Sequence, residues 1–393
     1  MTGIPLRFGV FIPPQHPLRE NPTLLFERDL DVISLCDRLG YDEAWIGEHH
    51  SGGFETIAAP ELIIAVAAER TKRIRLGTGV RSLPYTHPLT VADTLVQLDH
   101  MTRGRVMFGV GPGALPIDAM QLGIDPGHSR AMMEEALEVI VPLLEGERVS
   151  AERDWFTLRD ARLQIAPYTR PRMEMAVTTV RSPAGAMVAG RFGLGMLSLG
   201  GASDSALAAY AANWGVCEEF AAKHGRTVER SGFRIAVPMH LAETREQAVA
   251  DLRYGFDSWV GYAREVLPFG PIPDGVDDPL AFVMETRRAI IGTPDDAIRA
   301  IEAMQEGCGG FGVFLSMEQD WADWAATDRS YELFARRVIP HFRGQLAARR
   351  ESYAYSAQRK PAYTVAAQEA VNDVKARYER ERAPAGAKKG AAE

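Results

Sequence analysis

The sequence has 393 residues, of which 46% are hydrophobic and 24% charged, and its net charge is −8. This composition is typical of a globular chain with a large apolar core. No apolar run is long enough to span a membrane and no Lys/Arg cluster is dense enough for a nucleic-acid face, so we expect neither partner. Three widely separated cysteines and an N-terminus without a signal pattern favour the cytoplasm, and they argue against a disulfide framework or a zinc site.

Eight short apolar runs, each bounded by Gly, Pro or polar residues, predict buried strands. In chain order, these strands are expected at residues 6–12, 43–47, 74–80, 105–110, 173–178, 194–199, 233–241 and 309–315. Helical spacing of apolar residues follows each run. Helices are expected at residues 23–39, 59–70, 87–101, 129–144, 184–191, 204–223, 244–265 and 330–342, with a further helix that begins at Pro294 after the N-cap Thr293.

The alternation of strands and helices predicts an α/β fold, a single (β/α)8 TIM barrel with insertions and a C-terminal helical tail. The alternative is a doubly wound sheet. That fold would need a Gly-x-Gly-x-x-Gly turn between a strand and a helix, whereas Gly109, Gly111 and Gly113 have the wrong spacing.

Two segments interrupt the alternation. Residues 147–165 are hairpin-like, which indicates an insertion at about 145–168. Residues 267–276 are interrupted repeatedly by Pro and Gly, so we expect an irregular, functional or mobile loop within a second insertion at about 266–290. The barrel is expected to cover residues 1–345. Residues 346–393 are expected to form a helical extension, with a surface helix at about 364–381 and a disordered end.

Glu48, His49 and His50 follow the second predicted strand, and a parallel barrel places its chemistry at the carboxyl ends of its strands. If the strand continues, only one of the two histidines faces the barrel mouth. The alternative is a buried, hydrogen-bonded histidine. A metal site is less favoured, because no His-Glu-x-x-His helix is present.

Glycines follow the third and fourth predicted strands. In Gly77-Thr78-Gly79-Val80 they let the backbone approach a flat ligand, although a plain turn is the better explanation of this segment taken alone. After Phe108, a glycine-rich exit leads to a helix with Arg130 in its first turn. An arginine is unfavourable at that end of a helix unless an anion is bound, which favours a phosphate site.

The fifth predicted strand ends in Thr178-Thr179-Val180-Arg181-Ser182-Pro183. Ser182 is expected as the N-cap of the next helix, with Pro183 at its first position. The same backbone amides would also serve as phosphate ligands. Both interpretations of Ser182 remain open from the residues alone.

Taken together, these segments resemble the bacterial luciferase-like family of flavin-dependent monooxygenases. The resemblance is strong over residues 8–199, and it is closest to the limonene 1,2-monooxygenase branch. The matching segments are EHH (48–50), RLGTGV (75–80), LPYTHP (83–88), LDHMTRGR (98–105), FGVG (108–111) and SR (129–130).

The resemblance implies that FMN, or alternatively FAD, lies reduced across the carboxyl end of the barrel with His49 as the catalytic residue beside its reactive ring. It implies cofactor contacts at Glu48, Gly79, Val80, Gly111, His128, Arg130, Val180, Arg181 and Ser182. The Gly79–Val80 bond is expected to be a non-prolyl cis peptide under the isoalloxazine. Arg130, Ser182 and the Arg181 amide are expected to contact the flavin phosphate. Pro112 departs from the family, because the luciferase subunit has an arginine there, and His128 is the candidate replacement.

The implied reaction uses O2 and forms a flavin C4a-(hydro)peroxide, which oxygenates a small apolar substrate such as a terpene-like alkene or a ketone. His49 is expected to act as the acid/base, and residues 267–276 as a lid. The substrate is expected to lie against Phe11, Leu199 and Phe314. A separate NAD(P)H-dependent flavin reductase and a homodimer or homotetramer are also implied. The alternatives are a deazaflavin-dependent hydride-transfer oxidoreductase and a non-catalytic flavin-binding barrel.

Overall fold

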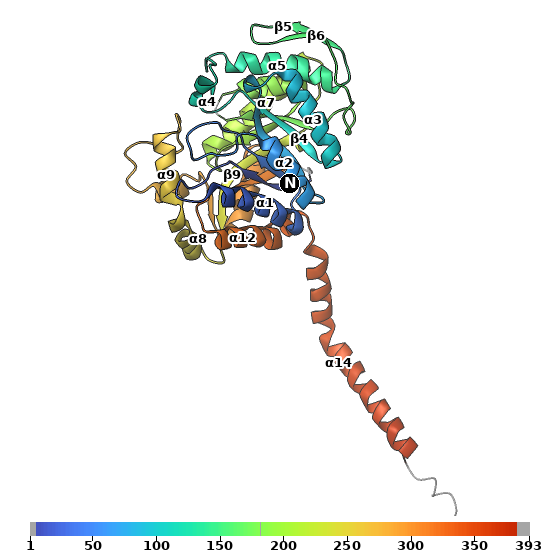
Figure 1. The fold of residues 1–393 in the computed structure, drawn as a ribbon. Helices are drawn as coiled ribbons and strands as arrows, with labels where there is room; N and C mark the ends of the chain where they lie inside the picture. The colour runs from blue at the N-terminus through green and yellow to red at the C-terminus, as the bar shows by residue number, and fades with distance from the viewer. Residues whose placement is uncertain (1–4, 181, 383–393) are drawn as a thin grey trace, which may run out of the picture. The chain divides into compact units, whose positions relative to one another are not determined.

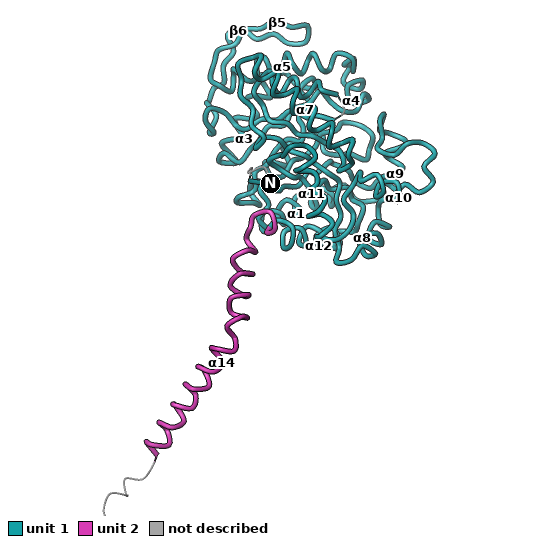
Figure 2. Tube along the Cα trace, turned by 180° about the vertical axis from the view of Figure 1, so that it is seen from behind, with its two compact units in different colours: residues 1–339 teal, residues 340–393 magenta. Residues whose placement is uncertain are grey.

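The computed structural model describes residues 5–180 and 182–382. The chain divides into two compact units, residues 1–339 and residues 340–393 (Figure 2). The first unit contains every strand of the described chain, and the described residues of the second are helical apart from a turn at residues 343–346. None of the helices in the described ranges is both long and apolar enough to cross a bilayer.

Eight parallel strands close into a barrel, which confirms the predicted (β/α)8 architecture (Figure 1). Their order around the barrel is β9, β11, β1, β2, β3, β4, β7 and β8, and a pairing between β8 and β9 closes the ring. The strands are β1 (Arg7–Ile12), β2 (Glu43–Ile46), β3 (Arg75–Ser82), β4 (Val106–Gly111), β7 (Met175–Thr179), β8 (Gly195–Leu199), β9 (Phe233–Leu241) and β11 (Val313–Met317).

Local signals mark the ends of several helices, but the last barrel helix, predicted at 330–342, begins earlier, at Trp324, and changes to a π-helical turn after Leu333. Asn21 caps the first helix through the Thr23 amide, and Gly40 ends it in the left-handed conformation. Thr293, which precedes Pro294, forms a capping box with Asp296 in the first turn of the helix. The helices are α1 (Pro22–Leu39), α2 (Pro60–Arg70), α3 (Pro88–Thr102), α5 (Ser129–Leu144), α6 (Ala184–Phe192), α7 (Asp204–Lys223), α11 (Pro294–Gly307) and α12 (Trp324–Leu333).

The barrel interior is filled around Trp45. A Cβ atom on Gly77 would lie 2.7 Å from the Trp45 ring and one on Gly109 would lie 2.9 Å from it, so these glycines make room for the indole. Phe314 points the other way, to the helix layer, where its ring stacks on Phe334 at 5.9 Å. The expected contact between Phe314 and a substrate is therefore wrong, because alternate strand residues face opposite sides.

Charged side chains close the amino end of the barrel. Arg234 is fully buried and donates to Glu43 at 2.8 Å and to Glu174 at 2.5 Å. Arg7 lies 2.7 Å from Glu43, and Arg75 lies 2.6 Å from Glu174. Each charge in this cluster has an opposite charge within reach, which is the condition for burying it.

The predicted helix at 244–265 is wrong as a single element, because the chain turns at Gly255. A Cβ atom there would lie 2.0 Å from the Asp320 carbonyl oxygen, and the Gly255 amide donates to the Trp321 carbonyl. The segment divides into α8 (Arg245–Asp251), the 3-10 turn η3 (Leu252–Tyr254) and α9 (Phe256–Glu265).

Apolar residues from the segment 252–291, together with Trp321, build a separate cluster, which we call the side core. It also contains α10 (Pro279–Glu285), and the short strand β10 (Ile290–Gly292) adds to β9 outside the closed ring. Residues 267–276 form only turns and bends, as predicted. The buried members of the side core are Leu252, Phe256, Trp259, Val260, Ile272, Val283, Ala289 and Trp321.

Smaller elements complete the first unit. The predicted hairpin is present as β5 (Val149–Glu152) and β6 (Thr157–Ala161), which pair antiparallel. The turn η1 (Leu83–Tyr85) and the short helix α4 (Pro116–Gln121) were not predicted. The three cysteines, Cys36, Cys217 and Cys308, are all buried and unpaired.

After α12, the π-helical turn η4 (Phe334–Val338) and α13 (Ile339–Phe342) lead to α14 (Ala347–Arg382). The tail helix is twice as long as the predicted 364–381, and Pro361 lies inside it. None of its side chains is buried. The expected disordered end, residues 383–393, lies outside the described residues.

Candidate active site

His49 and His50 lie in the loop after β2, because the strand ends at Ile46. The alternation expected for a continuing strand therefore does not apply, and each histidine has its own carboxylate partners. The His49 amide donates to the Ile57 carbonyl at 3.0 Å, which holds the loop back on itself. Both imidazoles are partly buried rather than enclosed in the interior.

The His49 imidazole lies between two carboxylates. Its Nδ1 is 3.0 Å from Asp118 Oδ2, and its Nε2 is 3.4 Å from Glu55 Oε2. Asp118 also accepts from the Ser51 hydroxyl and from the His50 amide, so its orientation is determined from three sides. The His49 side chain keeps 15% of its surface exposed, which leaves it an open edge.

This setting favours the protonated imidazole. Burial lowers the pKa of His49, but the charges of Glu55 and Asp118 outweigh burial and the net pKa is raised. Burial would raise the pKa of Asp118, but the hydrogen bonds from His49 and Ser51 lower it. A histidine that titrates above its usual range supplies a proton at neutral pH.

Glu48 organises the neighbouring loop. Its carboxylate accepts from His50 Nε2 at 3.0 Å and from the Ser82 amide at 3.2 Å, and it lies 2.8 Å from Arg81 Nη1. The Glu48 side chain is fully buried. These contacts hold the ends of β2 and β3 together, and the predicted contact of Glu48 with the cofactor remains a prediction.

The glycine-rich tips of β3 and β4 lie on one rim. The Gly79–Val80 bond is cis, as expected from the resemblance. A Cβ atom on Gly111 would lie 2.7 Å from Val80 Cγ2 and 3.1 Å from Thr178 Cγ2, so the ends of β3, β4 and β7 meet. Val80, Leu199 and Met317 are only partly buried and pack on the interior cluster. They form an apolar floor that suits a flat aromatic ligand.

The predicted phosphate contacts lie at the starts of α5 and α6, and neither helix has a side-chain cap. Arg130 is exposed and has no hydrogen bond or ion pair among the described residues. Ser182 precedes α6, but the helix begins at Ala184 with Pro183 at the cap, so the predicted N-cap role of Ser182 is wrong. Amides at such helix starts favour an anion.

The remaining predicted contacts are exposed or undescribed. Val180 is 51% exposed at the end of β7. The His128 side chain is 76% exposed and lies 3.9 Å from Asp125. Arg181 lies outside the described residues. In the described part of the chain, no hydrogen bond joins the starts of α5 and α6.

Three residues of this site escaped prediction from the sequence: Glu55, Asp118 and Tyr262. Glu55 accepts from the Tyr262 hydroxyl, and Tyr262 is carried by α9. They come from three separate loops and insertions, so no sequence spacing connects them. The available signal was Pro116, which marks the start of α4 and so places Asp118 in a first helical turn.

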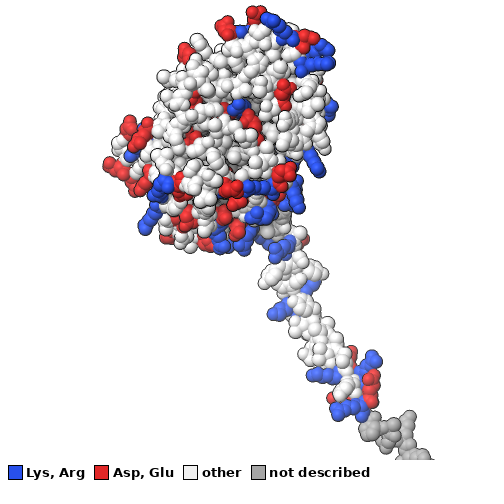
Figure 3. All heavy atoms as spheres, in the orientation of Figure 1, with Lys and Arg blue, Asp and Glu red and all other residues white. Residues whose placement is uncertain are grey.

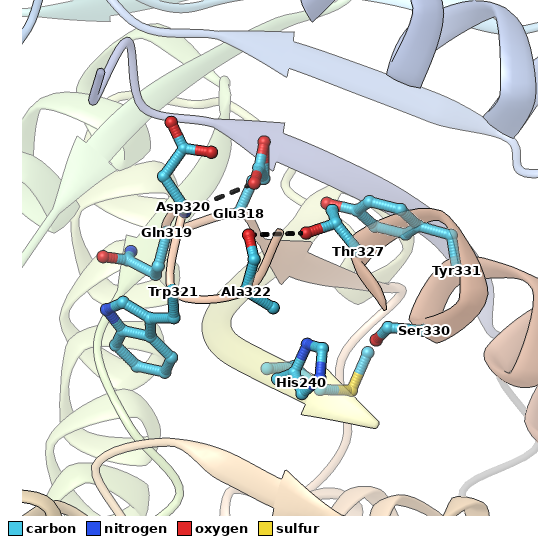
Figure 4. Close-up of a pocket in the computed structure, with 10 residues that line it drawn as sticks. His240, Glu318, Gln319, Asp320, Trp321, Ala322, Thr327, Ser330 and Tyr331 are labelled. Carbon is cyan, nitrogen blue, oxygen red and sulfur yellow. Dashed lines mark hydrogen bonds between the residues drawn. The ribbon is translucent and has the colours of Figure 1, made fainter. Parts of the chain in front are cut away.

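A small cavity lies elsewhere on the same side, between the end of β9 and α12 (Figure 4). Its volume is about 20 Å³, and its lining includes His240, Glu318, Asp320 and Ser330. Arg28 pairs with Glu318 at 2.9 Å and also with Asp320. The cavity has room for about one water molecule and is far too small for a flavin.

The surface of the first unit carries acidic and basic side chains side by side on the face shown in Figure 3. Within residues 5–180 and 182–382, no group of three or more His, Cys, Asp or Glu side chains is arranged to hold a metal ion.

The family profile and the similar proteins described below agree on one family for this chain. The profile of the luciferase-like monooxygenases matches residues 6–309. Limonene 1,2-monooxygenase of Rhodococcus erythropolis is 44% identical over 377 residues, which covers 96% of this chain and 97% of the relative. The 4-hydroxyprotoasukamycin monooxygenase of Streptomyces nodosus subsp. asukaensis is 45% identical over 370 residues, with 92% and 99% covered.

Among solved structures, the oxygenating constituent of 3,6-diketocamphane monooxygenase from Pseudomonas putida, a type II Baeyer-Villiger monooxygenase in complex with FMN, is similar with a TM-score of 0.71. It is 26% identical, and the match covers 85% of this chain and 98% of that one. These findings confirm the resemblance inferred from the motifs. The chain therefore belongs to the luciferase-like monooxygenase family, a family of flavin-dependent enzymes.

Proposed function

We propose that this chain is the oxygenase component of a two-component monooxygenase, which takes up reduced FMN and uses O2 to oxygenate a small apolar substrate. A terpene-like alkene or a ketone is the substrate class, since the relatives are named for limonene and a diketocamphane. The observation that carries the proposal is His49, held between Asp118 and Glu55 on the rim that also bears the cis Gly79–Val80 bond.

The residues present fit a flavin mononucleotide. The apolar floor of Val80, Leu199 and Met317 suits the isoalloxazine, and the unpaired guanidinium of Arg130 suits the phosphate. The N-terminal amides of α5 add favourable electrostatics for that anion. FMN is preferred over FAD because the similar structure contains FMN.

When bound, the reduced flavin supplies the electrons for oxygen chemistry. The protein's part is to orient the ring, exclude water and manage a proton. Asp118 holds the His49 imidazole through Nδ1. The other nitrogen, Nε2, and its proton therefore lie on the opposite edge of the imidazole. Residues 267–276, next to α9, are the segment that would cover the rim.

A separate NAD(P)H-dependent reductase would deliver the reduced flavin. The sequence has no dinucleotide-binding turn of its own, and the FMN-containing relative is described as an oxygenating constituent. We further propose a homodimer or homotetramer in the cytoplasm, where the three unpaired cysteines stay reduced.

The test is a substrate panel of cyclic alkenes and bicyclic ketones with a generic flavin reductase, NADH, FMN and ¹⁸O2. We expect a product heavier by one ¹⁸O atom, detected by mass spectrometry, and no product without O2. The absence of any labelled product from terpene and ketone substrates would contradict the proposal. Oxygen-independent turnover with a reduced deazaflavin would instead establish hydride transfer.

A further inference from the structure

The side core holds α9 from one side. Phe256 and Trp259 of this helix pack on Trp321, with ring centroids 5.4 and 5.1 Å apart. Trp321 lies beyond the end of β11, so this cluster is built outside the barrel interior. Tyr262 is also buried in α9 but is not a member of the side core. Its side chain makes its contacts with the loop after β2.

Tyr262 is fitted closely to that loop. Its ring stacks on Phe54, with centroids 4.6 Å apart and planes 11° from parallel. Its hydroxyl donates to Glu55 Oε2. A Cβ atom on Gly52 would lie 3.7 Å from the Tyr262 ring, so the loop passes closely beneath it. These contacts are specific in geometry as well as apolar.

The Glu55 oxygen that accepts the hydrogen bond from the Tyr262 hydroxyl is the same oxygen that lies next to His49. Glu55 Oε2 lies 3.4 Å from His49 Nε2, at the imidazole nitrogen that Asp118 does not occupy. A carboxylate oxygen that accepts a hydrogen bond has less charge to offer a second partner. Tyr262 and His49 therefore compete for one atom.

Other groups also face the imidazole. Asp118 approaches from α4, and Glu48 precedes His49 in its own loop. Tyr85 of η1 lies within the field of Asp118 and Glu48, and its own pKa is raised by burial and by both carboxylates. Among these neighbours, only Glu55 receives its hydrogen bond from a residue of the side-core helix α9. Glu55 therefore links α9 to His49 by direct contacts on both sides.

We propose that Tyr262 is a positioning residue that acts through Glu55 to determine when His49 holds its proton. The proposal deepens the proposed function and rests on it, because it concerns the proton that His49 manages there. With α9 docked, the Tyr262 hydroxyl restrains Glu55. Without the Tyr262 hydroxyl, Glu55 would turn its full charge on His49 and the imidazole would keep its proton more firmly. The hydrogen bond from Tyr262 thus makes the proton of His49 easier to give up.

The proposal predicts opposite effects at its two residues. Tyr262→Phe removes the hydroxyl but keeps the ring, so the pKa of His49 is expected to rise by about 0.5. Glu55→Gln removes the charge that Tyr262 modulates, so that pKa is expected to fall by about 1. In the double variant the Tyr262 change is expected to have no further effect, because the hydroxyl acts only through the carboxylate.

The experiment is an NMR pH titration of the full chain labelled with ¹³C at histidine Cε1. His49→Gln identifies the resonance of His49 by its disappearance. Tyr254→Phe is the matched control, since the Tyr254 hydroxyl also donates to a carboxylate of a neighbouring loop, Glu20, without touching Glu55. Circular dichroism confirms that each variant is folded.

A rise in the His49 pKa in Tyr262→Phe that is absent from Tyr254→Phe supports the proposal. An unchanged pKa in folded Tyr262→Phe overturns it, and so does an equal rise in Tyr254→Phe or in the Glu55→Gln background. Tyr262→Phe decides the question alone if Glu55→Gln does not fold. The descending limb of the pH–rate profile is expected to move by the same amount as the NMR pKa.

The titration needs no flavin and no substrate. A wild-type chain that gives no oxygenated product while Tyr262→Phe raises the His49 pKa would contradict the proposed function and leave the link between α9 and His49 intact. The reverse pattern, an oxygenated product with an unmoved pKa, would contradict only the role of Tyr262. The two failures are therefore distinguishable.

Discussion

His49 has carboxylates on both ring nitrogens, Asp118 at Nδ1 and Glu55 at Nε2. Two consequences follow for its chemistry. The imidazole cannot easily rotate, because Asp118 and Glu55 approach it from opposite edges. Its proton is also stabilised, since burial is outweighed by the two charges. Both properties suit a residue that delivers a proton to one defined place.

Removal of this imidazole is expected to stop catalysis without removing the binding site. For His49→Ala we expect product formation to fall by ~10²–10⁴-fold, with flavin affinity largely retained. Coupled turnover assays and flavin titrations measure the two effects. His100→Gln is the matched control, because His100 is exposed and its imidazole bonds to a backbone carbonyl, that of Ala166, and to no carboxylate among the described residues. Unchanged coupled turnover in His49→Ala would remove this residue from the mechanism.

The Asp118→Asn variant tests, through the pH dependence of the reaction, whether the charge of Asp118 raises the pKa of His49. The raised pKa keeps His49 protonated to a higher pH, and loss of the Asp118 charge is expected to lower that pKa. Activity that needs the protonated form should then decline from a lower pH in the variant than in the wild type. Rate measurements between pH 5 and 9 at saturating flavin check this expectation. A descending limb at the wild-type pH would show that Asp118 does not influence the proton.

Arg130 is exposed and unpaired among the described residues, so its removal is expected to affect binding and not folding. For Arg130→Ala we expect flavin binding to weaken by ~1.5–3 kcal/mol, with no change in the unfolding midpoint. Fluorescence titration with FMN and thermal unfolding measure these two quantities. Arg148→Ala, on the hairpin, serves as the control. An unaltered flavin dissociation constant would refute the phosphate assignment.

At the level of the strands, the two ends of the barrel have different roles. The amino ends of β1, β2, β3 and β9 hold the buried ionic cluster, whereas the carboxyl ends hold His49 and the cis bond. In barrels of this kind the former end supports stability and the latter supports chemistry. The two ends can therefore be altered independently.

Arg234→Met is expected to destabilise the barrel by ~3–5 kcal/mol, because Glu43 would remain buried without its main partner. Denaturant unfolding measures the loss. Arg234→Met/Glu43→Gln, which removes both charges, should recover part of the stability, and His49 chemistry should persist in any folded fraction. Equal stability of the single variant and the wild type would contradict this account of the cluster.

The sequence predicted the closed barrel and all eight strands because each strand has a local apolar run and each helix a local period. It failed where a distant contact decides the local structure. Gly255 turns the chain because Asp320 and Trp321 approach it. In the same way, His49 was found from a motif, but Glu55 and Tyr262 meet it only through the fold.

For the whole molecule, the division into two units has a direct consequence for stability. The tail helix α14 has no buried side chain, so its removal takes no buried apolar side chain out of the chain. For a chain that ends at Arg343, the thermal unfolding midpoint is expected to lie within about 2 °C of that of the full chain. The midpoint would fall further only if the truncation removed buried apolar surface. Scanning calorimetry at several protein concentrations measures it. A large drop that depends on concentration would show that the tail stabilises an assembly.

The burial of all three cysteines makes this protein suitable for site-specific labelling. Burial raises the pKa of the Cys36 and Cys308 thiols, and that of Cys217 to about 12, so none is a reactive thiolate at neutral pH. A thiol introduced by Phe269→Cys, at a position 77% exposed in the irregular segment 267–276, would react alone with a maleimide dye. Its fluorescence would report the opening and closing of that segment in the otherwise native chain.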